Sequence, residues 1–180
     1  MTSTQVTWGD AIVQLTWEKQ SQLPPRDLIT STHGYCFYQG KLMLVNLRDR
    51  GWDFPGGHIE LNETPEMCFQ REAMEEGYVE GDCRLLGSIV VDHHNNPHWS
   101  EESLYPKVGY QVFYRMDIKK LHSFRAEYES FERIFIEPSD IPTYYSNYNI
   151  VYQAILEDSL NIGRVSNVTG INELGSPYRG

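Results

Sequence analysis

The 180-residue sequence has no long apolar run and no basic leader segment. A membrane-spanning helix needs roughly 20 consecutive apolar residues, and no stretch approaches that length. The first residues also lack the basic segment that opens a signal peptide. These two absences predict a soluble protein that is not exported and has no membrane partner.

Cysteine is scarce as well, with Cys36, Cys68 and Cys83 as the three examples. An odd number of thiols without metal-binding spacing argues against both a disulfide framework and a zinc site. Thiols of this kind are typical of a reducing compartment, so we expect a cytoplasmic protein in which they are buried as small hydrophobic side chains.

Basic residues number 15 against 25 acidic ones, which gives a formal net charge of −10. This balance disfavours non-specific binding to DNA or to an anionic membrane. An acidic protein still handles a phosphorylated small molecule when divalent cations bridge its carboxylates to the phosphates. A cluster of carboxylates is therefore the feature to look for.

The hydrophobic pattern predicts one α/β domain over residues 1–160, followed by a flexible, glycine-containing tail over 161–180. Val13, Leu15 and Trp17 alternate with polar residues as in a half-buried strand. Residues 28–38 and 41–47 flank Gln39-Gly40 and predict a hairpin. Residues 48–59 are rich in Gly, Asp and Pro and predict a loop, further strands are expected at 84–91, 108–118 and 131–136, and residues 150–155 have helical spacing.

A helix is predicted from Pro65 to Glu76, because Thr64 suits the N-cap and Pro65 the first helical position. On this helix Glu72, Glu75 and Glu76 stand at i, i+3 and i+4 and share one face. Three neighbouring carboxylates repel each other unless cations neutralise them, and hard oxygen ligands suit Mg²⁺ or Mn²⁺. The alternative is an ordinary solvated helix face.

The segment from Gly57 to Val79 resembles the Nudix box, G-x5-E-x7-R-E-U-x-E-E-x-G-U, in which U is apolar. The matching positions are Gly57, Glu63, Arg71, Glu72, Glu75 and Glu76. One position departs from the pattern, because the last glycine of the box falls on Tyr78 while a glycine stands one residue earlier. We expect Gly77 to adopt a left-handed conformation that ends the helix, with Tyr78 beyond the metal site.

The resemblance implies a Nudix-type α/β/α sandwich with a mixed β-sheet and a hydrolase that acts on a nucleotide-like diphosphate. It further implies that the Gly56 carbonyl and the three helical glutamates coordinate Mg²⁺ or Mn²⁺, while Glu63 and Arg71 organise the loop. Glu75, Glu76, Glu63 and Arg71 are the expected catalytic set. The metal lowers the pKa of the attacking water and neutralises the phosphate oxygens.

A general base outside the box is also expected, because the box carboxylates are committed to metal. Glu127, Glu129 and Glu132 lie just before or within the strand predicted at 131–136. We favour Glu129, which has the freedom of a loop position, over Glu132 and then Glu127. A solvated role for each of them is the alternative.

Several other side chains have two interpretations. Trp52 either stacks on a base or anchors the core. Arg48 and Arg50 either approach phosphates or solvate the loop. The histidines of the polar connection at residues 92–107 either bind metal or belong to a polar surface loop; they are His93, His94 and His98. In either case the connection can form part of the substrate pocket.

The sequence favours a nucleoside triphosphate among the substrates that the resemblance implies, with a nucleotide sugar and ADP-ribose left open. An RNA 5′-end pyrophosphohydrolase, an isoprenoid-diphosphate isomerase and a catalytically silent nucleotide sensor are the competing functions. The acidic balance argues against the RNA activity. A homodimer is compatible with the sequence.

Overall fold

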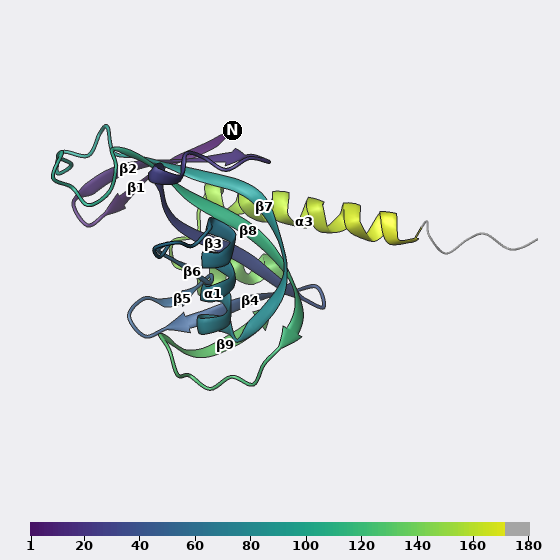
Figure 1. The fold of residues 1–180 in the computed structure, drawn as a ribbon. Helices are drawn as coiled ribbons and strands as arrows, with labels where there is room; N and C mark the ends of the chain where they lie inside the picture. The colour runs from purple at the N-terminus through teal and green to yellow at the C-terminus, as the bar shows by residue number, and fades with distance from the viewer. Residues whose placement is uncertain (172–180) are drawn as a thin grey trace, which may run out of the picture.

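The computed structural model describes residues 1–171, with side chains over residues 1–163. Its centre is a mixed nine-stranded sheet in which the main path runs β1-β2-β7-β8-β3-β4-β5, while β6 pairs with β3 and β9 with β4 (Figure 1). The strands are β1 (Thr2–Trp8), β2 (Ala11–Lys19), β3 (Ile29–Tyr38), β4 (Lys41–Leu47), β5 (Gly51–Asp53), β6 (Gly56–Gly57), β7 (Val79–Asp92), β8 (Val108–Leu121) and β9 (Ser130–Ile136).

Two long helices cover the two faces of this sheet. Helix α1 (Pro65–Gly77) lies in front of β3 and β4 in the view of Figure 1, and α3 (Ile150–Ile171, yellow) runs behind β7 and contacts β1 and β2. Two 3₁₀ turns (Arg26–Leu28 and Pro138–Asp140) and the short α2 (Ile141–Tyr144) connect the elements. The predicted α/β/α sandwich with a mixed sheet is confirmed.

Each helix packs on its own hydrophobic core, because side chains alternate between the two faces of a strand. Tyr35 and Phe37 of β3 belong to the core beneath α3, whereas Cys36 between them belongs to the core beneath α1. The alternating residues of β2 contribute to the first core, and Phe69 and Ala73 of α1 contribute to the second. The sheet is therefore buried on both sides.

The predicted hairpin forms, with Gln39 and Gly40 both at positive φ (50° and 77°) in its two-residue turn. Its strands separate after two residue pairs, and β3 continues as a parallel partner of β8 from Ile29 to Phe37. This parallel pairing makes the sheet mixed, and it joins segments that lie some 80 positions apart in the chain.

The prediction of an uninterrupted loop at residues 48–59 was wrong, because β5 and β6 lie within it. Gly56 and Gly57 pair with His33 and Thr32 of β3, an approach that glycine allows. A Cβ atom at Gly56 would stand 2.4 Å from the carbonyl oxygen of Thr32. The Gly-rich character that suggested a loop thus reflects close packing onto a strand.

Helix α1 begins as predicted, with the Thr64 hydroxyl accepting a hydrogen bond from the Met67 amide at 3.1 Å and Pro65 in the first turn. Its end differs from the prediction. Gly77 is the last helical residue, and Tyr78 is the residue in the left-handed conformation, with φ 55° and ψ 43°. The left-handed backbone conformation therefore occurs at the position where the Nudix box has its last glycine, although this chain has a tyrosine there.

Helix α3 continues to Ile171 and so covers the first part of the segment expected to be a tail. Its inner side is anchored by Arg115 of β8, whose guanidinium donates to the Ser159 carbonyl at 2.8 Å and lies against Gly163. Leu160 and Ile162 pack against the core. Residues 172–180 of the expected tail lie outside the described residues.

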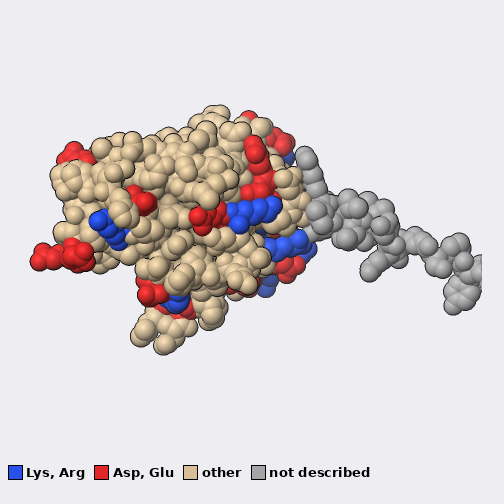
Figure 2. Space-filling model, turned by 90° about the horizontal axis from the view of Figure 1, so that it is seen from above, with Lys and Arg blue, Asp and Glu red and all other residues tan. Residues whose placement is uncertain are grey.

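The surface seen from above in Figure 2 carries acidic and basic side chains in small, interspersed groups on a mainly uncharged background. On this face, the described residues form no continuous basic patch of the kind that binds a polyanion. None of the helices within residues 1–171 combines the length and the apolar character required to cross a membrane.

Candidate functional site

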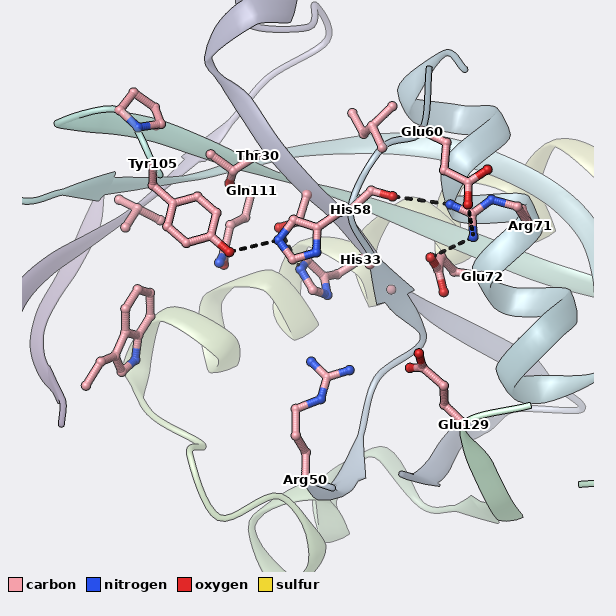
Figure 3. A pocket seen from close by; sticks show the side chains of 18 of the residues that line it. Thr30, His33, Arg50, His58, Glu60, Arg71, Glu72, Tyr105, Gln111 and Glu129 are labelled. Atoms are coloured by element: carbon pink, nitrogen blue, oxygen red, sulfur yellow. Dashed lines mark hydrogen bonds and ion pairs between the residues drawn. The ribbon is translucent and has the colours of Figure 1, made fainter. Parts of the chain in front are cut away.

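Four of the six matching residues of the box, Gly57, Arg71, Glu72 and Glu75, line one side of a cavity of about 780 Å³. Its walls come from α1, from the loop between β6 and α1, from the start of β3, and from the segments before β5, β8 and β9 (Figure 3). Glu72, Glu75 and Arg71 line one end of it, together with Gly56 and Gly57. The volume falls in the range of sites for small organic ligands.

Arg71 organises the acidic end of the cavity. Its Nε donates to Glu63 Oε1 at 2.5 Å, and its Nη2 reaches the His58 carbonyl at 3.2 Å. Through Nη1 it also donates to Glu72 at 2.8 Å and to Glu75 at 3.3 Å. One guanidinium therefore ties the loop before α1 to the helix and offsets the repulsion among its carboxylates.

Glu63 acts mainly within this loop. Its Oε2 accepts from the Glu60 amide at 2.9 Å, and the hydrogen bond from Arg71 holds the pKa of its carboxyl below the usual range. A carboxylate that is paired in this way has a structural task. This arrangement agrees with the organising role that the resemblance implies for Glu63 and Arg71.

Glu76 is the most unusual member of the acidic face, because it is 2% exposed. Its Oε2 accepts a hydrogen bond from the Gly56 amide at 3.2 Å, while Oε1 has no hydrogen-bond partner among the described residues. Burial, reinforced by the charge of Glu72, raises the pKa of Glu76 to about 9. A buried polar atom without a partner is costly, and a catalytic role or a bound ion is among the explanations for it.

Gly57 leaves the space that Glu72 occupies. A Cβ atom on Gly57 would stand 2.3 Å from Glu72 Oε1, so an alanine there would collide with the carboxylate. Burial raises the pKa of Glu72, and the neighbouring charge of Arg71 acts in the opposite direction. The glycine of the box thus serves to bring the helical carboxylate close to the loop.

These residues fit a divalent cation, although in the described part of the chain no three acidic, histidine or cysteine side chains converge into a ready-made cage. The unpartnered Oε1 of Glu76 is an oxygen donor aimed at no other group. Glu72 and Glu75 share a single arginine as their counter-ion. Oxygen donors of this type suit Mg²⁺ or Mn²⁺.

The candidate bases occupy different environments. Glu129 lines the cavity, and in Figure 3 its carboxylate points from the start of β9 toward Glu72. Glu132 instead accepts a hydrogen bond from Asn46 at 2.9 Å on the exposed sheet surface, and the carboxylate of Glu127 lies 4.0 Å from Arg125. Of the three, Glu129 is the residue that the structure brings to the box.

Arg50 projects into the middle of the cavity in Figure 3, and its closest acidic neighbours, Asp49 and Asp53, are 3.8 and 3.9 Å away. Arg48 turns away and donates to the carbonyls of Ala126 and Tyr128. The sequence gives the same two interpretations for both arginines. In the structure, Arg50 lies in the cavity and Arg48 packs on the loop before β9.

The end of the cavity away from the acidic helix is aromatic. The rings of His58 and Tyr105 are stacked with centroids 6.0 Å apart and joined by a 3.0 Å hydrogen bond (Figure 3). Trp8 is a further aromatic residue that lines the cavity. Trp8 and Tyr105 are 44% and 42% exposed. Sequence analysis did not identify either residue as part of the site. The signal that could have indicated them was an aromatic residue next to a turn.

Trp52 and the histidines of residues 92–107 lie in different environments. Trp52 packs against the core, and the centroids of its ring and the Tyr144 ring are 5.7 Å apart. This placement matches a core anchor. His93 lines the cavity, whereas His94 pairs with Asp92 on the surface and His98 is exposed. The connection at residues 92–107 thus contributes to the pocket through His93 and Tyr105.

A mixed sheet between two helices, with an acidic helix facing a cavity, defines a Nudix-type α/β/α domain. The family model of the NUDIX domain matches residues 32–149, and the chain belongs to this family. Among solved structures, the Bacillus subtilis pyrophosphohydrolase BsRppH superposes with a TM-score of 0.68 at 23% identity, covering 91% of this chain and 98% of that one. A Streptococcus suis ADP-ribose pyrophosphatase gives a TM-score of 0.50 at 24% identity, covering 74% of this chain and 90% of that one.

Two curated proteins are similar over shorter stretches. An 8-oxo-dGTP diphosphatase from Proteus vulgaris is 48% identical over 42 residues, which are 23% of this chain and 38% of that protein. A MutT-like protein from Streptomyces ambofaciens is 30% identical over 66 residues, 36% of this chain and 43% of that protein. The matched segments thus span less than half of either relative.

Proposed function

We propose that this protein hydrolyses a pyrophosphate bond of a nucleoside triphosphate, with Mg²⁺ or Mn²⁺ held by Glu72, Glu75, Glu76 and the Gly56 carbonyl. The observation that carries the proposal is the burial of Glu76 beside the acidic end of the cavity. Its Oε1 has no hydrogen-bond partner among the described residues. A buried carboxylate without a cationic partner is expensive in a purely structural role.

The cavity has the polarity that a nucleotide requires. Its acidic, metal-fitting end suits the phosphates, Arg50 offers a positive group in the middle, and Tyr105 offers aromatic surface at the far end. Trp8 adds a second aromatic side chain to the lining. Aromatic side chains stack on nucleobases with an affinity of roughly 1–3 kcal/mol per base. The similarity to an 8-oxo-dGTP diphosphatase supports a nucleoside triphosphate over a nucleotide sugar or ADP-ribose.

In the proposed mechanism, a water molecule attacks phosphorus in line with the oxygen that bridges the α- and β-phosphates, and the bond from phosphorus to that oxygen breaks to release a nucleoside monophosphate and pyrophosphate. The cation supplies charge neutralisation and a lowered pKa of the water. Glu129, across the cavity from α1, accepts the proton of that water, and Arg50 contacts the phosphate oxygens. Arg71 keeps the loop and the helical carboxylates in register through its bonds to Glu63 and His58.

Product analysis over a panel of nucleotides, with Mg²⁺ and with EDTA, tests this proposal. We expect release of pyrophosphate from nucleoside triphosphates, including oxidised ones, and no turnover in EDTA. Preferential cleavage of a 5′-triphosphorylated oligonucleotide would assign the RNA activity instead. Binding of nucleotides without turnover in the presence of either metal would identify a sensor and contradict the proposed hydrolysis.

A further inference from the structure

The end of helix α1 contains a residue in an unfavourable backbone conformation. Tyr78 has φ 55° and ψ 43°, the left-handed region, where an L-residue other than glycine is strained. The Nudix box has a glycine at this position, which would relieve the strain. A tyrosine that persists there needs contacts that outweigh the backbone cost.

Most of those contacts go to the segment that carries Glu129, and Arg133 Nη1 of β9 also donates to the Tyr78 carbonyl at 3.2 Å. The Tyr78 side chain is 4% exposed, and its ring packs edge-on against Phe124 with centroids 5.0 Å apart. Its hydroxyl accepts a hydrogen bond from the Glu127 amide at 2.9 Å, and its carbonyl accepts one from the His122 amide at 2.9 Å. One residue therefore holds the beginning and the end of the 122–127 segment.

We propose that Tyr78 is a positioning residue that fixes the 122–129 segment to the carboxylate helix and thereby directs Glu129 into the cavity. The catalytic part of this inference rests on the proposed role of Glu129. A glycine at position 78 would supply the backbone conformation but neither the ring nor the hydroxyl, so the clamp is specific to the tyrosine of this chain.

The segment depends on such a clamp because residues 122–129 belong to no helix or strand. Ala126 within it also has a positive φ, 54°. On its exposed side the segment is held by Arg48, which donates to the Ala126 carbonyl at 3.3 Å and through its amide to the Glu129 carbonyl at 3.0 Å. Tyr78 and Arg133, whose Nη2 donates to the His122 carbonyl at 2.7 Å, provide the inner attachments and Arg48 the exposed one.

The experiment compares Tyr78→Phe, which removes the hydroxyl, with Tyr78→Gly, which restores the residue of the box pattern. Gln39→Gly is the matched control, because Gln39 is also non-glycine at positive φ but lies in the β3–β4 turn. Hydrogen–deuterium exchange of residues 122–129 in the full chain reports the clamp without reference to activity.

We expect exchange at the Glu127 amide to rise about fivefold in Tyr78→Phe, and exchange across 122–129 to rise at least tenfold in Tyr78→Gly. The amides in the middle of α1 should keep their protection in both variants. Gln39→Gly should match the wild-type chain. Unchanged exchange over 122–129 in Tyr78→Gly would overturn the clamp, whatever the activity.

Kinetics then test whether the clamp positions Glu129. We expect Tyr78→Gly to lower kcat about tenfold with KM nearly unchanged, Tyr78→Phe to retain an intermediate kcat, and Tyr78→Gly to add little to Glu129→Gln in the double variant. Faster exchange with wild-type kcat in Tyr78→Gly, alongside a large loss in Glu129→Gln, would refute the positioning role. If Glu129→Gln keeps wild-type kcat, the proposed base is wrong, and the exchange data alone decide the clamp.

Discussion

At the scale of single residues, Glu76 differs from the other two glutamates of the acidic helix face. It stands in the same i, i+3, i+4 pattern as Glu72 and Glu75, yet it alone of the three is nearly inaccessible and has an unpartnered oxygen. Burial favours the protonated carboxyl in the protein without metal, as the raised pKa of about 9 indicates.

Glu76→Gln should therefore abolish activity while leaving the fold intact. We expect kcat/KM to fall at least a hundredfold, because a metal ligand is lost, while the amide oxygen still accepts from Gly56. The melting temperature in EDTA should stay the same or rise, since a buried acid near Glu72 is removed. Glu66→Gln, an exposed change in the first turn of α1, is the control. Wild-type turnover of Glu76→Gln at limiting Mg²⁺ would contradict the assignment.

At the scale of elements, two glycines at opposite ends of the box have different tasks. A Cβ at Gly57 meets the Glu72 carboxylate at 2.3 Å, whereas a Cβ at Gly77 meets the terminal methyl of Met43 at 2.4 Å. A side chain at position 57 would therefore displace the Glu72 carboxylate. A side chain at position 77 would displace only the flexible end of Met43 in the core.

Gly57→Ala should raise the Mg²⁺ concentration required for half-maximal activity about tenfold, because Glu72 must turn away from the loop. Titrations of activity with Mg²⁺, together with melting temperatures in EDTA, measure the two effects separately. A chain that keeps the wild-type Mg²⁺ requirement after this change would show that Glu72 need not lie against Gly57.

Gly77→Ala should keep the wild-type Mg²⁺ requirement. Because Gly77 is helical and not left-handed as the sequence predicted, an alanine there carries no left-handed backbone penalty. Alanine favours a helix over glycine by about 1 kcal/mol, which offsets the shift of Met43. We expect a free energy of unfolding in urea within about 1 kcal/mol of wild type. A large destabilisation would mean that Met43 has no room to move.

At the scale of the whole molecule, the proposed cation site would link metal binding to folding. An ion that binds the folded chain but not the unfolded one stabilises it by RT ln(1 + [L]/Kd), or roughly 2.7 kcal/mol at a hundredfold excess over Kd. We expect Mg²⁺ or Mn²⁺ to raise the melting temperature of the wild-type protein and to have little effect on Glu76→Gln. An equal rise in both would place the stabilising ion elsewhere.

His33 makes stability depend on pH. Burial, helped by the charge of Arg50, lowers its pKa to about 4, whereas an unfolded histidine titrates near 6.5. Between these values the unfolded chain binds a proton that the folded chain does not. Stability in EDTA should therefore fall as the pH drops from about 7 toward 4, by at most about 3 kcal/mol from this residue.

Urea unfolding of the wild-type chain and of His33→Gln over this pH range checks the effect. Glutamine removes the titration and keeps a polar group near Ser31, whose hydroxyl lies 2.9 Å from His33 Nε2. We expect a flatter pH dependence in the variant. Identical curves for both chains would assign the acid sensitivity to other groups.

The sequence by itself determined the local features of this protein. The capped helix that begins at Pro65, its acidic face and the alternating strand around Leu15 follow from residues that are neighbours in the chain. The box pattern also led to the family. These features depend on 3.6- and 2-residue periods and on capping, which short stretches of sequence determine.

Only the tertiary structure decided which distant residues meet. It brought Glu129 rather than Glu132 to the cavity, joined Tyr105 to His58, and paired β3 with β8 in parallel. It also placed the left-handed residue at Tyr78, because contacts with the 122–129 segment oppose the intrinsic preference for glycine. The physical reason is that such pairings depend on burial and strand register across long sequence separations, which local periodicity does not encode.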